Sequence, residues 1–352
     1  DLFWNLPFPL PPLNEQKRIV EKLDAILPRV KSAKARLEKI PVILKKFRQS
    51  VLAAACSGRL TEEWREGNSN GKDASNLILE LYKYRKSEIE NGNIKKTKYD
   101  SLNLIVENNF NKINTWVVTY LNHITSLITD GKHGDCQDEI NSGYYFLSAK
   151  DIKEGKLFYD NAREINYSEF KEVHKRTNLE PGDICMVNTG ATVGKLAIAP
   201  DSYLTHKTTF QKSVAIIKPI RKFINNKYVA IFLNYQSELL LKKSKGSAIN
   251  NLLIGQIKEY QIPLPPLEEQ HEIVRRVEKL FALADSIEAK YKKALERVEK
   301  LEQAILAKAF RGELVEPDPN DEPAEELLKR ILEEKAKIEG GKKTRKPKVR
   351  KK

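Results

Sequence analysis

The sequence PLPPLNEQ at residues 9–16 decides the fold, because it returns as PLPPLEEQ at residues 263–270. The shift of 254 residues holds without a gap as far as Gly58-Arg59-Leu60 in the first copy and Gly312-Glu313-Leu314 in the second. An internal repeat governs how the rest of a chain is interpreted. We therefore treat the two copies as related elements of one architecture.

Both copies carry apolar residues at alternating steps of four and three. The first series is Ile19, Leu23, Ile26, Val30, Ala33, Leu37, Ile40, Leu44, Phe47 and Val51, and the second is Ile273, Val277, Leu280, Ala284, Ile287, Tyr291, Ala294, Val298, Leu301 and Ile305. A mean spacing of about 3.5 residues is the period of a left-handed coiled coil. The pattern predicts two long helices that pair with each other.

The ends of the two copies support this prediction. Asn14 is a candidate N-terminal cap, and Gly58 and Gly312 stand where a left-handed C-terminal cap is expected. Pro28 and Pro41 occur only in the first copy and should kink or locally break that helix. The two ends of a globular domain usually lie close together, so the helices that flank one should run antiparallel.

The segment between the copies has a different periodicity. Short strands are predicted at 116–118, 144–147, 183–187, 195–199 and 212–218, and a helix at 227–243. We expect an α+β fold, with a mixed α/β central domain and two long helices packed as an intramolecular antiparallel coiled coil. The predicted segments are 1–8, the remnant of a preceding domain; 9–60, the first long helix; 61–109, a linker and short helix; 110–262, the central domain; 263–314, the second long helix; 315–340, a linker and short helix; and 341–352, a disordered basic tail.

Charge and cysteine content limit the partners and the cellular location to be expected. The formal net charge is +14, and residues 341–352 supply eight of the basic residues without an acid. Such a tail is most often a solvated extension, and its commonest functional use is weak contact with nucleic acid. Three scattered cysteines suit a reducing cytosol, and no apolar run is long enough to span a bilayer, so a cytoplasmic location is expected. The lack of an initiator methionine suggests that a natural N-terminal part is missing.

A search for catalytic motifs gives no enzyme assignment. Residues 188–195, NTGATVGK, lack the spacing and the final Ser or Thr of a phosphate loop, and a tight glycine turn between two strands is the preferred interpretation. The histidines have no metal-ligand spacing, and no cofactor or metal is predicted. The polar, glycine-containing loops are better suited to touching DNA, and the candidate DNA-binding residues are Lys132, His133, Lys150, Thr189, Thr192, Lys195, Lys207, Lys245, Ser247 and Asn250. The five lysines are predicted to share one face.

At this point the chain resembles the specificity subunits of type I restriction–modification enzymes. The resemblance rests on the repeated PLPPLxEQxxIV motif, on the Ala-x-x-Gly-x-Leu that ends each copy, and on Pro181-Gly182-Asp183-Ile184 with residues 189–195. It implies that the central domain is a target-recognition domain and that a first such domain is lacking here.

The resemblance also implies a function and a set of partners. Such a subunit is not itself catalytic; it reads part of a split DNA target and uses its paired helices as a spacer that docks two methyltransferase subunits, which a restriction and translocation subunit joins. The expected partners are therefore double-stranded DNA and these subunits, with no membrane. The alternative is a non-catalytic protein-interaction scaffold without DNA sequence specificity. An enzyme with a degenerate site is the third hypothesis, and no residue constellation supports it.

Overall fold

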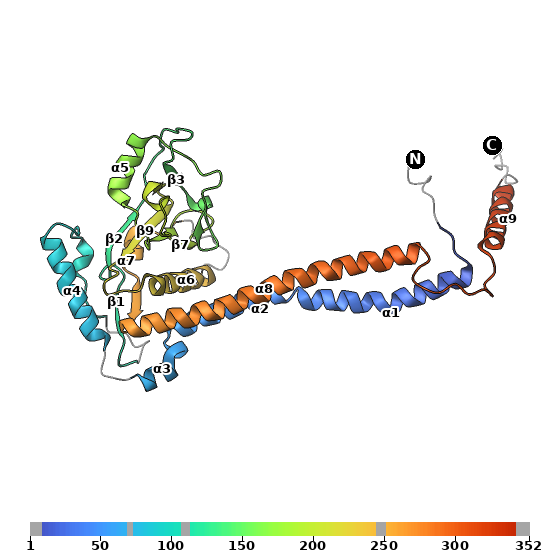
Figure 1. The fold of residues 1–352 in the computed structure, drawn as a ribbon, viewed down its shortest axis with the longest axis horizontal. Coiled ribbons are helices and arrows are strands. Elements are labelled where there is room, and N and C mark those ends of the chain that lie inside the picture. The colour runs from blue at the N-terminus through green and yellow to red at the C-terminus, as the bar shows by residue number, and fades with distance from the viewer. Residues whose placement is uncertain (1–8, 69–72, 107–112, 244–250, 343–352) are drawn as a thin grey trace, which may run out of the picture. The chain divides into compact units, whose positions relative to one another are not determined.

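A computed structural model describes residues 9–68, 73–106, 113–243 and 251–342. The chain forms two compact units: residues 1–44 with 285–352, and residues 45–284. The helices are α1 Leu13–Leu37, α2 Ile40–Cys56, α3 Glu62–Gly67, α4 Ala74–Glu90, α5 Tyr167–Thr177, α6 Asn226–Lys243, α7 Ile254–Lys258, α8 Leu267–Phe310 and α9 Ala324–Lys342 (Figure 1).

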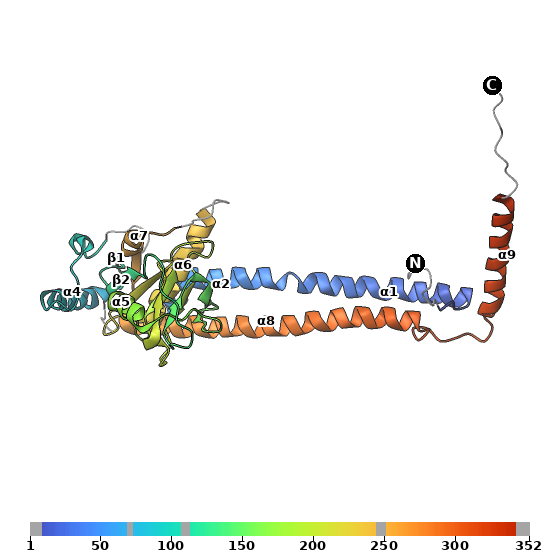
Figure 2. The same ribbon diagram turned by 90° about the horizontal axis from the view of Figure 1, so that it is seen from above.

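The first unit consists of α1, the C-terminal part of α8, and α9. Lys34 lies 3.2 Å from Glu299, whereas Arg18, nearer the start of α1, binds Asp321 beyond the end of α8 at 2.7 Å. Residue numbers thus rise along one helix as they fall along the other. Figure 2 shows α1 and α8 side by side. This confirms the antiparallel pairing in this unit.

The same pairing holds in the second unit. The Arg276 guanidinium donates to the Leu60 carbonyl at 2.8 Å, and Thr61 donates to Glu269 at 2.7 Å. The end of α2 therefore lies beside the start of α8. Val51, Leu52, Ala55 and Cys56 share one buried cluster with Ile273, Val274 and Val277. Val51, Ile273 and Val277 of the apolar series read from the sequence are therefore buried here, whereas Ile287 and Leu301 of the same series are 39% and 50% exposed.

The helix ends correct one expectation and confirm others. Asn14 is not the cap of α1, because the capping position is Pro12, and Asn14 lies inside the helix. The first long helix breaks at residues 38–39, so that Pro41 stands in the first turn of α2, where its missing N–H is tolerated. Pro28 lies within continuous α1. Gly58 and Gly312 have φ of 75° and 73°, as the left-handed caps require.

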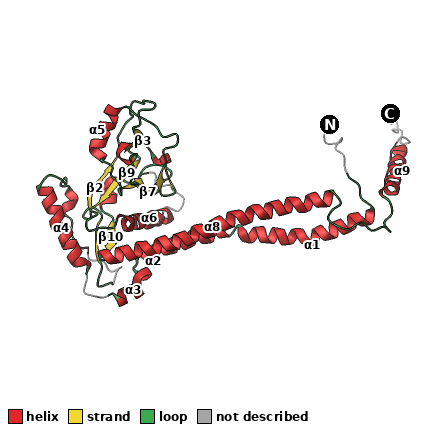
Figure 3. Cartoon of the chain, viewed as in Figure 1, coloured by secondary structure: helices red, strands yellow, loops and turns green. Residues whose placement is uncertain are grey.

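The central domain is a mixed α+β domain, as predicted. Its main sheet has the order β2-β9-β6-β7, and all its neighbouring strands are antiparallel. Smaller pairs join β1 to β10, β3 to β8 in parallel, and β4 to β5. The strands, yellow in Figure 3, are β1 Val117–Tyr120, β2 Thr125–Asp130, β3 Tyr145–Leu147, β4 Ile152–Lys153, β5 Lys156–Leu157, β6 Ile184–Val187, β7 Leu196–Ile198, β8 Thr208–Phe210, β9 Val214–Pro219 and β10 Gln261–Leu264.

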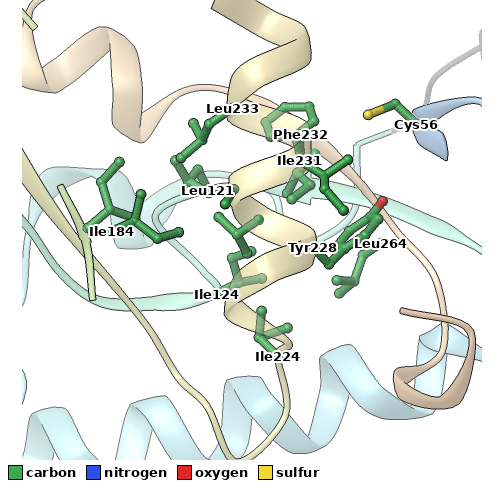
Figure 4. Close-up of a cluster of buried hydrophobic side chains, with 14 of the residues drawn as sticks. Cys56, Leu121, Ile124, Ile184, Ile224, Tyr228, Ile231, Phe232, Leu233 and Leu264 are labelled. Atoms are coloured by element: carbon green, nitrogen blue, oxygen red, sulfur yellow. The ribbon is translucent and has the colours of Figure 1, made fainter. Parts of the chain in front are cut away.

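The main sheet is buried on both faces. Along β6, Ile184 and Met186 belong to the cluster that includes α6, while Cys185 and Val187 belong to a second cluster with Leu147 of β3. This alternation is the two-residue period of a strand. Figure 4 shows Tyr228 and Phe232 of α6 among the apolar side chains of the first cluster. Burial on both faces leaves the ends of the strands as places where polar loops can reach solvent.

The short helix α4 begins at Ala74. Asp73 is the capping residue, and its carboxylate accepts from the Ser75 amide at 2.9 Å, so Ser75 lies inside the helix. Among the residues that the structure describes, no helix is long and apolar enough to cross a membrane.

Candidate nucleic-acid interface

Three loops leave the main sheet at one end. Val187, the last residue of β6, pairs with Val214, the first of β9, and Asp130, the last of β2, pairs with Ala215. Hydrogen bonds then link the loops themselves: the Lys212 amide donates to the Lys132 carbonyl and the Asn188 amide to the Ser213 carbonyl, both at 3.0 Å. The loops at 131–134, 188–195 and 211–213 therefore adjoin. They bring together five of the predicted residues: Lys132, His133, Thr189, Thr192 and Lys195.

The loop at 188–195 is a tight glycine turn between two strands, as preferred from the sequence. It joins β6 to β7, whereas a phosphate loop would join a strand to a helix. Gly190 and Gly194 have φ of 102° and 94°, which other residues rarely adopt. A Cβ on Gly194 would also lie 2.6 Å from the Cβ of Ser237 on α6. This close packing on α6 fixes the position of the neighbouring Lys195, which is exposed.

Lys132 is already held by two carboxylates. Its ammonium forms an ion pair with Glu169, on α5, and lies 3.7 Å from Glu172. The hydrogen bond to Glu169 raises the pKa of Lys132, so that it stays charged. Its backbone is held too, because a Cβ on Gly131 would overlap the carbonyl of Phe210. A phosphate that binds Lys132 would therefore exchange places with a carboxylate.

His133 and Arg176 share a carboxylate beside Lys132. His133 Nε2 lies 3.0 Å from Asp130 Oδ2, and Arg176 of α5 binds the other oxygen of Asp130. About half of the Arg176 side chain is exposed, at 49%. Neither α5 nor Arg176 was predicted from the sequence. The spacing of Phe170, Val173 and Thr177, all buried, is the helical signal that could have revealed this element.

Lys207 lies among aromatic rings. Its Nζ donates to the Tyr144 hydroxyl at 3.0 Å and stands 4.2 Å from the centre of that ring and 5.4 Å from that of Tyr203. The hydrogen bond to Tyr144 raises the pKa of Lys207. Tyr144 in turn packs on Phe170, next to the Glu169 that holds Lys132. The first turns of α5 thus connect the surroundings of Lys132 and Lys207.

The remaining predicted residues do not join this group in the same way. Lys150 is exposed on the short helix η4 (Ala149–Asp151), which Ser148 and Asp151 cap reciprocally, and it precedes the β4–β5 hairpin. Lys245, Ser247 and Asn250 lie outside the described residues. The single face for all five lysines therefore stays a prediction.

Two polar atoms at this end of the sheet have no partner in the described part of the chain. The Asn188 Oδ1 and the Ser213 Oγ are buried without a hydrogen bond to any described residue. Both residues belong to the adjoining loops, and the Asn188 amide donates to the Ser213 carbonyl at 3.0 Å. Buried polar atoms without partners are unusual and cost free energy.

The described part of the chain contains three thiols with raised pKa values and no candidate cluster of metal ligands. That part has no cluster of three or more His, Cys, Asp or Glu placed to hold a metal ion. Burial raises the pKa of Cys56 to about 12 and that of Cys136 to about 11. Burial likewise raises the pKa of Cys185. Thiols of this kind are unreactive.

The fold is that of an α+β domain with a glycine turn, carried by a pair of antiparallel helices. The sequence profile described as the type I restriction modification DNA specificity domain matches residues 137–297. The type I restriction enzyme EcoDI specificity subunit of Escherichia coli is 35% identical over 347 residues, which cover 95% of this chain and 70% of that protein. The chain belongs to the family of type I restriction enzyme specificity subunits.

Other comparisons agree with this assignment. The EcoBI specificity subunit of Escherichia coli is 39% identical over 347 residues, and the match covers 95% of this chain. The chain spans 65% of the length of that relative. A solved structure reported under "Structural basis underlying complex assembly and conformational transition of the type I R-M system" matches with a TM-score of 0.59 at 20% identity, over 87% of this chain and 62% of that one. This likeness shows a shared fold.

Proposed function

We propose that the chain is the non-catalytic, sequence-specific DNA-recognition subunit of a type I restriction–modification complex, acting in the cytoplasm. It reads part of a split target through the central domain. Its paired helices dock methyltransferase subunits, and a restriction and translocation subunit joins the assembly. The observation that carries the proposal is the gathering of Lys132, Thr189, Thr192 and Lys195 at one end of the main sheet, in a member of the specificity-subunit family.

The chemistry of this sheet end suits DNA. Lysines neutralise phosphates and position a protein on the duplex, whereas hydroxyl and amide groups can read base edges. Lys195 is exposed and has no partner among the residues described, so it is the cation best placed to meet a phosphate directly. Lys132, His133 and Arg176 are neighbours whose carboxylate partners must first be displaced. We therefore expect Lys195 to contribute to the electrostatic part of DNA binding without first losing an ion pair.

The first step of the experiment is to identify the DNA sequence that the complex recognises. Mapping of methylated bases in a host genome, with and without the gene, would define the sequence that the complex recognises. Binding of the full chain to a duplex with that sequence is then followed by fluorescence anisotropy between roughly 50 and 200 mM salt. Affinity should fall steeply over this range, because each neutralised phosphate releases counterions.

Lys195→Ala should lower the slope of log affinity against log salt by about 1 and leave the preferred sequence unchanged. Lys300→Ala is the matched control, because Lys300 is an exposed lysine of α8 outside the proposed interface. An affinity that does not change with salt, together with unaltered methylation in cells that lack the gene, would favour the protein-interaction scaffold instead.

A further inference from the structure

The repeated Glu-Gln pair of the motif does more than begin a helix. In the second copy, Glu269 lies in the first turn of α8 with only 1% of its surface exposed. Its carboxylate accepts hydrogen bonds from Thr61 Oγ1 at 2.7 Å and from Trp116 Nε1 at 2.7 Å, and it forms an ion pair with Arg65. These donors come from three different segments.

The three segments meet at this carboxylate. Thr61 follows α2, Arg65 belongs to α3, and Trp116 immediately precedes β1, the strand that opens the central domain. Trp116 and Ile113 also cover the face of Gly58, since a Cβ there would lie 3.3 Å from the Trp116 ring and closer still to Ile113. The carboxylate therefore ties the beginning of the central domain to both long helices.

Gln270 binds the central domain at a second point. Its Oε1 accepts from the Asn225 amide, just before α6, at 2.9 Å, and its Nε2 donates to the Pro265 carbonyl at 3.0 Å. Gln270 is fully buried. Two consecutive residues of α8 thus bind the domain at β1 and at α6, two points that are far apart in the sequence.

Comparison with the first copy of the motif distinguishes the contacts of the glutamine from those of the glutamate. Gln16 makes the same bond to its own proline segment, to the Pro11 carbonyl at 2.8 Å. Glu15 is also buried, with 8% exposed. However, the positions that match Thr61 and Arg65 are Val315 and Pro319, which have neither a hydroxyl nor a guanidinium group. The glutamine bond is therefore common to both copies, whereas the hydroxyl and guanidinium donors to the glutamate occur at these positions in the second copy alone.

We propose that Glu269 is a positioning residue that sets the orientation of the central domain on α8. This inference rests on the proposed function of that domain as the part that reads DNA. Glu269 does not touch the proposed interface, so it acts on the angle at which the domain is presented. A free carboxylate can satisfy three donors at once because it has two acceptor oxygens with about four lone-pair sites, whereas an amide lacks the charge and offers a single acceptor oxygen.

The first experiment measures the orientation directly. Spin labels at Lys175→Cys on α5 and Lys279→Cys on α8, both exposed positions, report one distance across the domain and its helix in the full chain. The native cysteines are buried and should not be labelled. Glu269→Gln should broaden the distance distribution or shift its maximum. Glu272→Gln, which loses only ion pairs with Arg275 and Arg276 on the same helix, should leave it unchanged.

Trp116→Phe tests the same idea without removing the buried charge. It keeps an aromatic ring but removes the indole N–H together with part of the ring that packs on Gly58. Because the Glu269 carboxylate remains, this variant should fold even where Glu269→Gln does not, and it should broaden the same distribution. The second readout is activity in the assembled complex: both variants should bind the target duplex within about twofold of the wild type and yet lose most methylation of it.

The outcomes separate the two proposals. Wild-type chain that fails to bind target DNA would overturn the proposed function. Target binding with unchanged distances and unchanged methylation in both variants would overturn the positioning role alone. If both variants lost DNA affinity and thermal stability together while the distance distribution stayed the same, Glu269 would only stabilise the fold, and the positioning role would likewise be overturned.

Discussion

At the scale of single residues, the glycine turn of the proposed interface depends on two kinds of constraint. Gly190 and Gly194 both have positive φ, and Gly194 is packed against Ser237 of α6. Among the described residues, no heavy atom lies within 4 Å of a Cβ built on Gly190. The pair therefore separates the cost of a strained backbone from the cost of a steric clash.

Gly194→Ala should lower the free energy of unfolding by about 2–3 kcal/mol, because strain and overlap with Ser237 add together. Gly190→Ala, its matched control, should lower it by about 1 kcal/mol, because only the backbone strain remains. Urea denaturation of both variants checks the difference. Equal losses would show that α6 yields to the added methyl group.

A second residue-level prediction concerns acid stability. His123 is buried, and burial lowers its pKa from the usual value of 6.5; Arg85 lowers it further, while the Tyr99 backbone and Asp100 act in the opposite direction. The unfolded chain therefore binds this proton more readily than the folded one. Its contribution to stability is complete above pH 6.5 and declines as the pH falls below that value.

His123→Gln should accordingly flatten the fall in melting temperature between about pH 6.5 and 5, whatever its effect at neutral pH. His133 is the matched control, since it is an exposed histidine of the same domain. Thermal melts of the wild type, His123→Gln and His133→Gln at several pH values provide the measurement. A His123→Gln curve parallel to that of the wild type would exclude His123 as a source of the acid sensitivity.

At the scale of elements, the two prolines of the first copy should differ in cost. Pro28 lies in the middle of α1, where it removes a helical hydrogen bond, whereas Pro41 lies in the first turn of α2. Pro28→Ala should raise the free energy of unfolding by about 1–3 kcal/mol, and Pro41→Ala should change it by less than about 1 kcal/mol. Thermal denaturation of the two variants would test this order, and a larger gain from Pro41→Ala would contradict it.

Elements with strong periodicity were predictable from the sequence. The steps of four and three in the two copies predicted the paired helices, and the left-handed glycines predicted where each copy ends. Strands β6, β7 and β9 were found because their runs are apolar on both faces. The short elements β8 and α5 were missed, since few residues repeat in either and their burial depends on neighbours that are distant in the sequence.

The candidate site was only partly predictable for a similar reason. Glycine and lysine in the loop at 188–195 signalled a polar turn at a strand end, and the structure has that turn. The ion pairs of Lys132 with α5 and the rings around Lys207 were not predictable, because their partners stand well away along the chain. Asn14 was assigned as a cap from its residue type, but Pro12 fixes the backbone before it.

At the scale of the whole molecule, the two copies of the repeat differ in what they bury. Val274 is buried in the second copy, with 6% of its surface exposed, whereas Val20, its counterpart under the shift of 254 residues, is 55% exposed. Near it, residues 9–23 and 306–312 line an apolar recess of about 460 Å³. Among the described residues, the second copy of the motif therefore borders a filled core, whereas the first copy borders an open recess.

One of the positions at which the two copies of the repeat differ is occupied by Cys56 in the first copy and by Phe310 in the second. Cys56 lies near Tyr228 of α6 in the filled core (Figure 4), and its counterpart under the shift of 254 residues is Phe310, which is 60% exposed. A genetic crossover between the two copies would place a phenylalanine ring where Tyr228 now fits against a thiol. Such recombinants should be poorly tolerated, so the divergence at this position would help to preserve the order of the repeats through evolution.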